Sequence, residues 1–556
     1  MPWLQAYDPA GSPLVSTLLA ALPIFVLLGS LAFFKLKAHV AALLGLASAL
    51  AVALGVYGLP FGKGAAVAVY GAAYGLFPIG WIIFNVIFLY SLADGKGHFA
   101  VLRASLGGVT PDRRLQLLLI AFCFGAFFEG AAGFGTPVAV TAAILIGLGF
   151  TPLAASGLSL IANTAPVAFG ALGTPLVALA GVTGIDVRVL SAMVGRQLPL
   201  FSIIIPFWLV WAFAGMRGMA EIWPALLTAG ISFAVPQFLI SNYHGPWLAG
   251  VGAAVVSMGV LMAFLKVWRP RRIWTGTGTD NETAGANSAA PASPSAATAL
   301  IPRSRILRAW IPWLILSVFV FLWGIPAIKK FLDGISLPKL AVPGVDKLIF
   351  RIPPVVPAAT PEGAVFSLNW LSATGTGIFA AALISAWILG YSLKETAHLW
   401  WKTLERVRFS LLTVAAMMAV GFVTRYGGLD ATMGLAFART GVLYPFFGTM
   451  LGWLGVALTG SDTSSNVLFG SLQKITAGQL GLSPTLMAAA NSSGGVMGKM
   501  IDAQSIVVAS TATKWYGKEG EILRYVFFHS LALAGLMGLL VMLQAYWKPF
   551  VRLVVK

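Results

Sequence analysis

The feature that most constrains this chain is a stretch without any charged side chain, which runs from Gly130 to Ile185. A membrane-spanning helix needs about 20 apolar residues, so this stretch is too long for one span and must fold back at least once. Similar runs, free or nearly free of charge, recur at Leu14–Phe34, Val40–Pro60, Gly64–Ala93, Gln197–Met216, Ile222–Tyr243, Gly245–Leu265, Ala309–Ile328, Gly363–Leu393, Phe409–Thr424, Thr440–Ser461, Ile475–Gly498 and Tyr525–Trp547.

These runs predict an all-α polytopic membrane protein. Strands of a membrane β-barrel would be short and would alternate apolar with polar residues, whereas these runs are long and continuous. We expect about 12–14 transmembrane helices in two repeat-related halves, some of them re-entrant or broken. Composition agrees, because 58% of the residues are hydrophobic and only 10% are charged. This balance excludes a soluble globular enzyme and a disordered chain.

The positive charges lie in short clusters between the apolar runs. Lys and Arg number 36 against 18 Asp and Glu, and such clusters are typical of cytoplasmic loops rather than of nucleic-acid binding. A basic, low-complexity segment at 266–308 is therefore predicted to be a cytoplasmic linker between two transmembrane halves, 1–265 and 309–556. One span later, the proline-rich segment 326–362 is predicted to be an extracytoplasmic loop, and an external N-terminus is expected.

Two polar interruptions in the first half predict broken helices. The apolar run Leu115–Phe128 ends at Glu-Gly-Ala-Ala-Gly-Phe-Gly, residues 129–135, with Pro137 close behind. Glycine interrupts a helix and proline is suited to the start of the next one, so we expect a re-entrant hairpin with Glu129 at its turn. Residues 163–175 (NTAPVAFGALGTP) combine Asn, Thr, Gly and Pro inside the uncharged stretch, which predicts an unwound span.

The second half repeats this pattern. Residues 458–466 (LTGSDTSSN) interrupt an apolar run, and residues 491–499 (NSSGGVMGK) form a second polar break. Each half thus has an acid beside a break, followed by Asn with hydroxyl residues, which is weak internal symmetry of the kind found in transporters. Single Ser, Thr or Asn residues also hold membrane helices together, for about 1 kcal/mol or less each.

Four breaks in matching positions favour a binding site over simple helix association. Half-helix N-termini at such breaks present free N–H groups and positive dipole ends to an anion. The substrate-binding candidates are Gly133, Gly135, Asn163, Thr164, Ser464, Ser465, Asn466, Asn491, Ser492, Ser493 and Lys499.

A few charges fall inside the apolar stretches. An unpaired charge at the bilayer centre costs roughly 2.5–3.5 kcal/mol or more, so such residues are functional candidates. Glu129 and Asp462 are candidate proton carriers, with a helix-end position or a fixed pair with Lys499 as the alternative. Lys499 is a candidate for the substrate anion, and its alternative role is to pair with Asp502.

Four other arginines are expected to have structural roles and not to bind substrate. The sequence also lacks motifs typical of catalysis. Arg196 is expected to be an interface anchor, and Arg103, Arg113 and Arg114 ordinary charges of a cytoplasmic loop. The five histidines have no metal-ligand spacing, and no Walker motif is present. We therefore predict no metal, no cofactor and no enzymatic activity.

Six blocks of the sequence resemble the bacterial L-lactate permease family. They are residues 7–11 (YDPAG), 122–135 (FCFGAFFEGAAGFG), 163–170 (NTAPVAFG), 194–199 (VGRQLP), 453–466 (WLGVALTGSDTSSN) and 499–505 (KMIDAQS). The resemblance extends from Tyr7 to about Tyr546 and fades in the linker and at 326–350.

The resemblance implies proton-coupled uptake of L-lactate, with D-lactate and glycolate as further substrates, across the bacterial inner membrane. The family is similar to a wider group of ion transporters with two re-entrant hairpins. That similarity implies a site between 129–135 with 163–164, and 464–466 with 491–493.

Three alternatives remain open at this point. They are a sodium-coupled organic-anion transporter, an anion channel and an intramembrane enzyme, of which the last lacks a nucleophile–base or metal grouping. The sequence also leaves open whether two copies assemble as a homodimer.

Overall fold

The computed structural model describes residues 2–32, 34, 36–98, 101, 109–131, 133, 136–275, 302–516 and 518–555. Gly135 and most of the linker, 276–301, lie outside the described residues. The helices before the linker are α1 (Pro13–Ala32), α2 (Ala38–Gly55), α3 (Phe61–Tyr74), η1 (Gly75–Gly80), α4 (Trp81–Gly95), α6 (Arg113–Leu117), η2 (Leu118–Phe124), α7 (Gly125–Ala131), α8 (Thr136–Gly147), α9 (Pro152–Ala162), η3 (Val167–Phe169), α10 (Gly170–Thr183), α11 (Val187–Val194), α12 (Leu198–Glu221), α13 (Trp223–Tyr243) and α14 (Ala249–Val267). Those after it are α16 (Arg303–Gly324), α17 (Pro326–Ile335), α18 (Thr374–Ile388), α19 (Leu393–Gly427), α20 (Leu429–Phe437), η4 (Ala438–Leu443), α21 (Tyr444–Thr459), α22 (Asp462–Gln479), α23 (Pro484–Gly498), α24 (Ala503–Ala512), α25 (Glu519–Tyr546) and α26 (Lys548–Val551).

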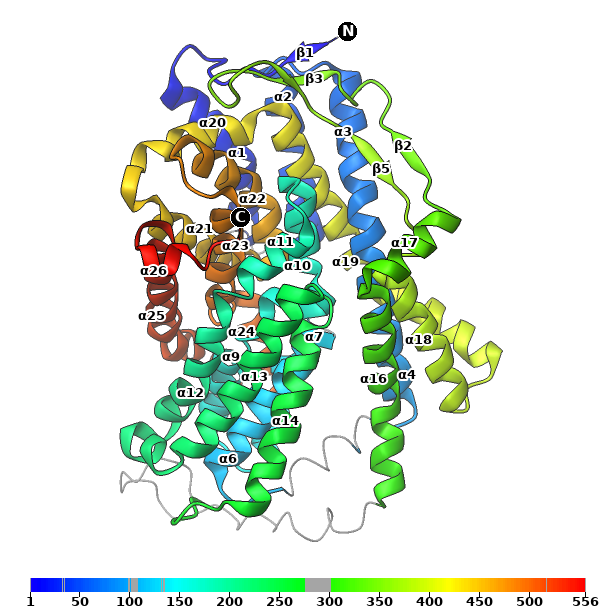
Figure 1. Ribbon diagram of the computed structural model, residues 1–556, viewed down its shortest axis with the longest axis vertical. Coiled ribbons are helices and arrows are strands. Elements are labelled where there is room, and N and C mark those ends of the chain that lie inside the picture. The colour runs from blue at the N-terminus through cyan, green and yellow to red at the C-terminus, as the bar shows by residue number, and fades with distance from the viewer. Residues whose placement is uncertain are drawn as a thin grey trace.

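The expected all-α, multi-pass architecture is confirmed (Figure 1). Among the described residues, 11 helices are long and apolar enough to cross a membrane, or 12 if the bent pair α9 and α10 is one span. Twelve spans is the lower edge of the expected range of about 12–14, and 11 is one fewer. Two of these helices, Phe61–Gly95 and Leu393–Gly427, are 35 residues long, which exceeds the bilayer core.

Three of the predicted interruptions are present. α7 ends at Ala131 and α8 packs back against it, while α9 and the segment Val167–Thr183 meet at a bend of 65°. α21 ends at Thr459, and its C-cap residue Gly460, whose φ is 72°, turns the chain toward α22. Glycine tolerates this backbone conformation without steric cost.

The fourth interruption is in a different place from the prediction. Asn491, Ser492 and Ser493 lie inside α23, a continuous helix that runs to Gly498. The chain breaks only afterwards, between Lys499 and the start of α24. The helix continues through these polar residues because neighbouring side chains form hydrogen bonds with them. A prediction from composition alone therefore placed the break too early.

Helices from the two sides of the linker pack against each other. α2 and α3 contact α19, α1 contacts α20, and α10 contacts α22. The α10–α22 contact is polar as well as apolar, because Lys474 Nζ donates to the carbonyl of Thr183 at 2.6 Å. The break in the first half and the break at the start of α22 are thereby brought together.

Short strands form a cap at one end of the molecule, opposite the residues that flank the linker (Figure 1). β1 (Trp3–Leu4) pairs in parallel with β3 (Ile349–Arg351), which pairs antiparallel with β4 (Thr360–Pro361). β2 (Lys339–Ala341) pairs antiparallel with β5 (Val365–Ser367). The N-terminus therefore lies at the same end as the loop that the sequence predicts to be external.

An ion-pair cluster fastens this cap to the helices. Glu362 accepts from Arg425 of α19 at 3.0 Å and also pairs with Arg351 of β3. Burial raises the pKa of the Glu362 carboxyl, but the guanidinium groups of Arg425 and Arg351 together outweigh burial and hold the pKa below its usual value. The charged form of Glu362 thus stabilises the folded state.

Replacing Glu362 with Gln should lower thermal stability in detergent at neutral pH. A partly exposed pair of this kind contributes less than the roughly 3–5 kcal/mol of a fully buried one, so we expect a loss of about 2 kcal/mol. Because the folded-state pKa is depressed, the contribution is complete above the unfolded value of about 4.3 and disappears as the pH falls through the folded-state pKa. Wild-type and variant melting curves should therefore converge in acid, and a difference that persists at low pH would contradict the assignment.

Arg114 is not the ordinary loop charge that the sequence analysis expected. Its side chain is fully buried and pairs with Asp112 at 2.8 Å and with Glu221 of α12 at 2.8 Å. It also donates to the carbonyl of Arg272 at 2.9 Å, and its guanidinium lies 4.6 Å from the ring centroid of Trp274. Arg114 therefore joins α6, the end of α12 and the start of the linker. Arg103 lies outside the described residues.

Candidate binding site

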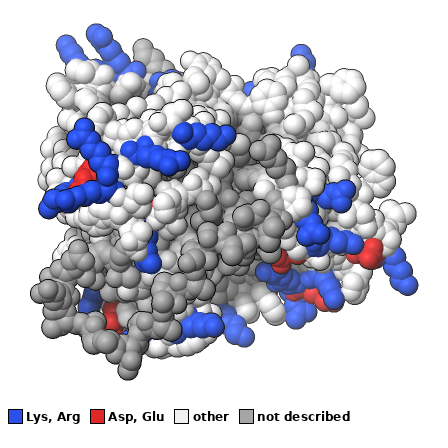
Figure 2. Space-filling model, turned by 90° about the horizontal axis from the view of Figure 1, so that it is seen from below, with Lys and Arg blue, Asp and Glu red and all other residues white. Residues whose placement is uncertain are grey.

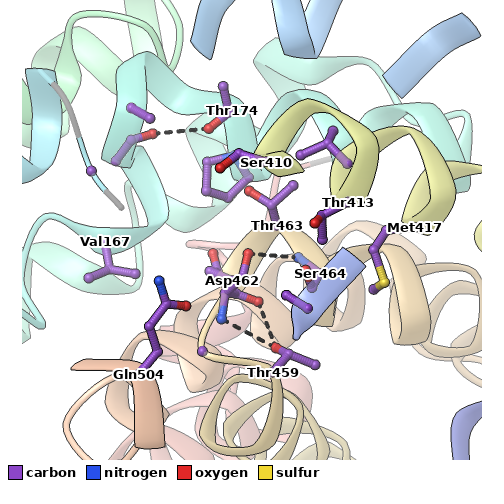
Figure 3. A pocket seen from close by; sticks show the side chains of 18 of the residues that line it. Val167, Thr174, Ser410, Thr413, Met417, Thr459, Asp462, Thr463, Ser464 and Gln504 are labelled. Atoms are coloured by element: carbon purple, nitrogen blue, oxygen red, sulfur yellow. Dashed lines mark hydrogen bonds between the residues drawn. The ribbon is translucent and has the colours of Figure 1, made fainter. Parts of the chain in front are cut away.

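A cavity of about 170 Å³ lies where the broken helices of the two halves meet. A cavity of this size holds several water-sized molecules or one small organic anion. Figure 3 shows its lining from several elements: Val167 of η3 and Gln504 of α24 lie on one side and Thr413 and Met417 of α19 on the other, with Asp462 between them. The predicted residues that reach the lining are Glu129, Gly133, Asp462, Ser464 and Lys499.

The break between α9 and α10 forms one wall. Ala171 and Leu172 have φ values of 42° and 54°, in a left-handed region that residues other than glycine rarely adopt. Ala171 and Thr174 both line the cavity. Strained backbone of this kind gathers at functional sites, and here it turns the start of α10 toward the cavity.

The N-terminus of α22 forms the opposite wall. Ser461 caps this helix, because its Oγ accepts from the backbone N–H of Ser464 at 3.2 Å. Ser461, Asp462, Thr463 and Ser464 all line the cavity. The positive end of the helix dipole and the hydroxyl groups of this first turn favour an anion.

Asp462 is buried at the base of this turn, with 3% of its surface exposed. Its Oδ2 accepts from Ser492 Oγ at 2.5 Å and from Asn466 Nδ2 at 3.4 Å. Its Oδ1 has no hydrogen-bond partner among the described residues. Ser492 and Asn466 therefore orient the carboxyl group and leave one oxygen for a proton or a ligand.

Glu129 approaches the cavity from the end of α7, with 5% of its surface exposed. Its Oε2 is buried and has no partner within the described part of the chain. The backbone of Gly170 lies so close that an added Cβ would be 2.6 Å from Glu129 Oε1. Both predicted proton carriers thus line one cavity, and each has an unpartnered oxygen.

Lys499 has the fixed partner that the sequence analysis gave as its alternative. Its Nζ lies 3.2 Å from Asp502 Oδ2 and donates to the carbonyl of Gly460 at 2.6 Å. Asp502 also caps α24 by accepting from Ser505 N at 2.7 Å. The side chain still lines the cavity, so a substrate role for Lys499 stays a prediction.

The remaining predicted polar residues lie behind the cavity wall. Asn491 Nδ2 donates to Asn466 Oδ1 at 3.0 Å, and Gln473 Nε2 donates to Asn491 Oδ1 at 3.2 Å. This network connects α22 to α23 and supports the turn that carries Asp462. The predicted residues that do not line the cavity are Asn163, Thr164, Ser465, Asn466, Asn491, Ser492 and Ser493.

Asn163 differs from the other residues behind the wall. It is buried with its amide near the Glu129 carboxyl group, and among the described residues neither its Oδ1 nor its Nδ2 has a hydrogen bond of good geometry. An unsatisfied buried amide is costly, so this residue remains a candidate for contact with a ligand or water.

Sequence reasoning missed the lining from α19. Ser410, Thr413 and Met417 contribute to the cavity, but hydroxyl and thioether side chains spaced along one apolar helix carry no distinctive signal. It also missed Asp430 of α20, whose surface is 1% exposed and whose carboxyl group lies near the hydroxyl groups of Thr424 and Ser471. The sequence signal that could have identified Asp430 is an acidic residue between two apolar runs.

Gly170→Ala should impair transport by crowding Glu129. Gly170 has an ordinary backbone conformation, with φ −63°, so the added methyl group acts by contact and not by backbone strain. We expect a slower maximal rate with little change in stability, measured by uptake and by thermal unfolding. Gly147→Ala is the matched control, because a Cβ there meets nothing within 4 Å. Equal rates for both variants would contradict the proximity of Gly170 to a working carboxyl group.

Comparison with known proteins places the chain in a family. The family model described as L-lactate permease matches residues 16–547. The chain belongs to the L-lactate permease family. Similar relatives are the glycolate permease GlcA of Escherichia coli K12, 47% identical, and the L-lactate permeases of Escherichia coli K12 and Bacillus subtilis, each 46% identical. Each alignment covers 98% of this chain and 98% of the relative.

Family membership makes this chain a multi-pass membrane permease and not an enzyme. Within the described residues, no group of three or more His, Cys, Asp or Glu side chains is placed to hold a metal ion.

Proposed function

We propose that this permease is a proton-coupled symporter that takes up L-lactate, D-lactate and glycolate across the bacterial inner membrane. The relatives named L-lactate permease and glycolate permease support L-lactate and glycolate as substrates. The observation that carries the coupling is the pair of buried carboxyl groups, Glu129 and Asp462, which line one cavity and each keep an oxygen without a partner. The bacterial relatives and the multi-pass fold support a location in the inner membrane.

The chemistry of the cavity suits a small 2-hydroxy acid. The N-terminal turn of α22 offers N–H groups, and the hydroxyl groups of Thr463 and Ser464 can hydrogen-bond to the substrate 2-OH. Lys499 adds a positive charge beside Gly460. A monocarboxylate of two or three carbons fits a cavity of about 170 Å³.

Proton coupling removes the electrical obstacle to uptake. An inside-negative membrane opposes the inward movement of a monovalent anion by about 2.3 kcal/mol per 100 mV. Transport of one proton with each lactate makes the cycle electroneutral and adds the pH gradient as a driving force. A protonated carboxyl group in the cavity also avoids the cost of a bare charge within the membrane.

Alternating access would act across the same cavity. Its walls come from η3 and α10 on one side of the linker, and from α19 and α22 on the other. We infer that relative movement of these two walls opens the cavity to each side in turn.

Labelled L-lactate uptake into proteoliposomes tests the proposal. An imposed inward proton gradient should drive accumulation without sodium, and glycolate should compete. Accumulation that needs sodium and persists without a pH gradient would favour the sodium-coupled alternative. Passage that never exceeds electrochemical equilibrium would indicate a channel, and the absence of lactate or glycolate uptake under any gradient would refute the substrate assignment.

A further inference from the structure

Two cationic side chains from the second half of the chain hold the C-terminal end of α10. Arg425 Nη1 of α19 donates to the carbonyls of Gly181 and Val182, at 3.0 Å each, and Lys474 Nζ of α22 donates to the carbonyl of Thr183 at 2.6 Å. The last carbonyls of a helix lack intrahelical partners and carry the negative end of its dipole. We call these two cations and three carbonyls the carbonyl clamp.

The three helices of the carbonyl clamp also line the candidate binding site. Thr174 of α10, Met417 of α19 and Ser464 of α22 all reach the cavity. On each helix the clamp residue follows the cavity residue by eight to ten positions, which is about 12–15 Å along the helix axis. The three helices therefore run in the same direction, from the cavity to the clamp.

An apolar layer fills the space between the cavity and the clamp. An added Cβ on Gly421 of α19 would lie 2.5 Å from Val467 Cγ1 of α22 and 3.1 Å from Val182 Cγ1 of α10. Val182 and Val467 are each 1% exposed. Contacts this close between all three helices leave no room for water, so the cavity is closed on the side of the clamp.

The cavity reaches the surface in the opposite direction. Its lining residues Ala38 and Ser410 are exposed, whereas Met417 is buried. Ser410 precedes Met417 on α19 and so lies farther from the clamp. Ala38 begins α2, whose other end leads to Gly58, where the carbonyl accepts from Trp3 Nε1 of the strand cap at 3.1 Å. Both exposed residues thus lie away from the cap.

The clamp is connected to the end of the molecule that the sequence predicts to be external. Arg425 also pairs with Glu362 of the strand cap at 3.0 Å, and this cap lies opposite the residues that flank the linker (Figure 1). Figure 2 looks onto the linker end and shows many Lys and Arg side chains and few acidic ones. Such an excess is typical of the cytoplasmic side, which supports an external position for the clamp.

We propose that Arg425 and Lys474 are the outer gate residues of the transport cycle. In the structure they hold α10 against α19 and α22 and close the cavity to the outside. For substrate to enter from outside, both side chains release the α10 carbonyls, and the apolar layer then separates. This inference rests on the alternating access of the proposed function. A cap that only stabilised the end of α10 would not change the side from which the cavity is reached.

A cysteine in the cavity wall tests the gate. Cys123 is the one cysteine of the chain and is buried, so Cys123→Ala with Thr413→Cys places a single reporter in the lining. The rate of its reaction with a membrane-impermeant methanethiosulfonate is measured in right-side-out and inside-out vesicles. The reporter should react fast from the inside and slowly from the outside.

Arg425→Gln, added to this background, should raise the outside rate roughly tenfold or more and should not raise the inside rate. Hydrogen bonds from a charged donor shift an equilibrium by at least about that factor. If this variant does not fold, Lys474→Gln removes a single cation-to-carbonyl bond and should raise the outside rate in the same way. Melting temperatures in detergent are recorded for every variant.

Arg188→Gln is the matched control. Arg188 Nη2 also donates to a carbonyl at the end of a helix, that of Gly324 on α16, at 2.8 Å. In the described part of the chain, α16 contributes no residue to the cavity lining. This variant should leave both labelling rates unchanged, whatever its effect on stability.

Three results would overturn the proposal. Unchanged outside rates in both Arg425→Gln and Lys474→Gln, even with lower melting temperatures, would reduce the clamp to a helix cap and leave the proposed function standing. An equal rise from both sides would indicate a loosened fold and no gate. Fast labelling from both sides before either substitution would indicate an open pore and refute the gate and the symporter together. Labelling needs neither lactate nor a proton gradient, so it does not depend on the substrate assignment.

Discussion

Asp462→Asn is expected to abolish proton-driven accumulation of lactate while leaving exchange of lactate across the membrane in place. Asn keeps the size of the side chain and its contact with Ser492, but it cannot carry a proton. With a pH gradient of one unit, electroneutral symport with one proton sustains about tenfold accumulation. The variant should reach about equal concentrations on both sides, measured by counterflow and by gradient-driven uptake in proteoliposomes.

Glu129→Gln distinguishes between the two acids. If only one carboxyl group carries the proton, one variant should lose accumulation and the other should keep it. Glu405→Gln, an exposed acid on α19 whose carboxyl accepts from Trp401 at 3.0 Å, is the control for removal of a carboxylate. Normal accumulation by both Asp462→Asn and Glu129→Gln would show that neither acid couples the proton.

Arg114→Leu is expected to cause the largest loss of stability. Asp112 would remain buried, with 0% of its residue surface exposed, and would lose its bidentate guanidinium partner. Removal of one member of a buried ion pair costs roughly 3–5 kcal/mol, a large part of the total stability of many domains. We expect poor expression and a markedly lower melting temperature in detergent.

Two further variants separate charge from packing at this position. Asp112→Asn combined with Arg114→Leu should recover part of the stability, because the uncompensated buried charge is then gone. Arg217→Gln should change little, since that side chain is 79% exposed and lies 3.7 Å from Glu221 in a single ion pair. A wild-type melting temperature for Arg114→Leu would refute the role of this cluster.

Several parts of the fold were predictable from local sequence because the bilayer makes them local properties. A backbone without water must satisfy its own hydrogen bonds, so long uncharged runs become helices. Glycine and proline interrupt such helices, which placed the breaks after Ala131, after Ala162 and at Gly460. The break expected at Asn491 was wrong because a polar residue inside a helix looks the same in sequence whether it faces a cavity or a neighbouring helix.

The sequence by itself determined the membrane class, the helical fold, the family and two buried acids near helix breaks. Each of these depends on residue type and spacing along the chain. Only the tertiary structure decided which polar residues share a space. Asp462 and Glu129 line one cavity, whereas Asn466 and Asn491 hydrogen-bond to each other behind its wall.

The tertiary structure also decided which charges are buried. Arg114 and Arg113 are neighbours in the chain, yet Arg114 is enclosed by α12 and the linker while Arg113 remains partly exposed. One physical reason explains both which polar residues share the cavity and which charges are buried. Burial and pairing depend on helices that are far apart in sequence, and local residue patterns carry no information on which of those helices meet.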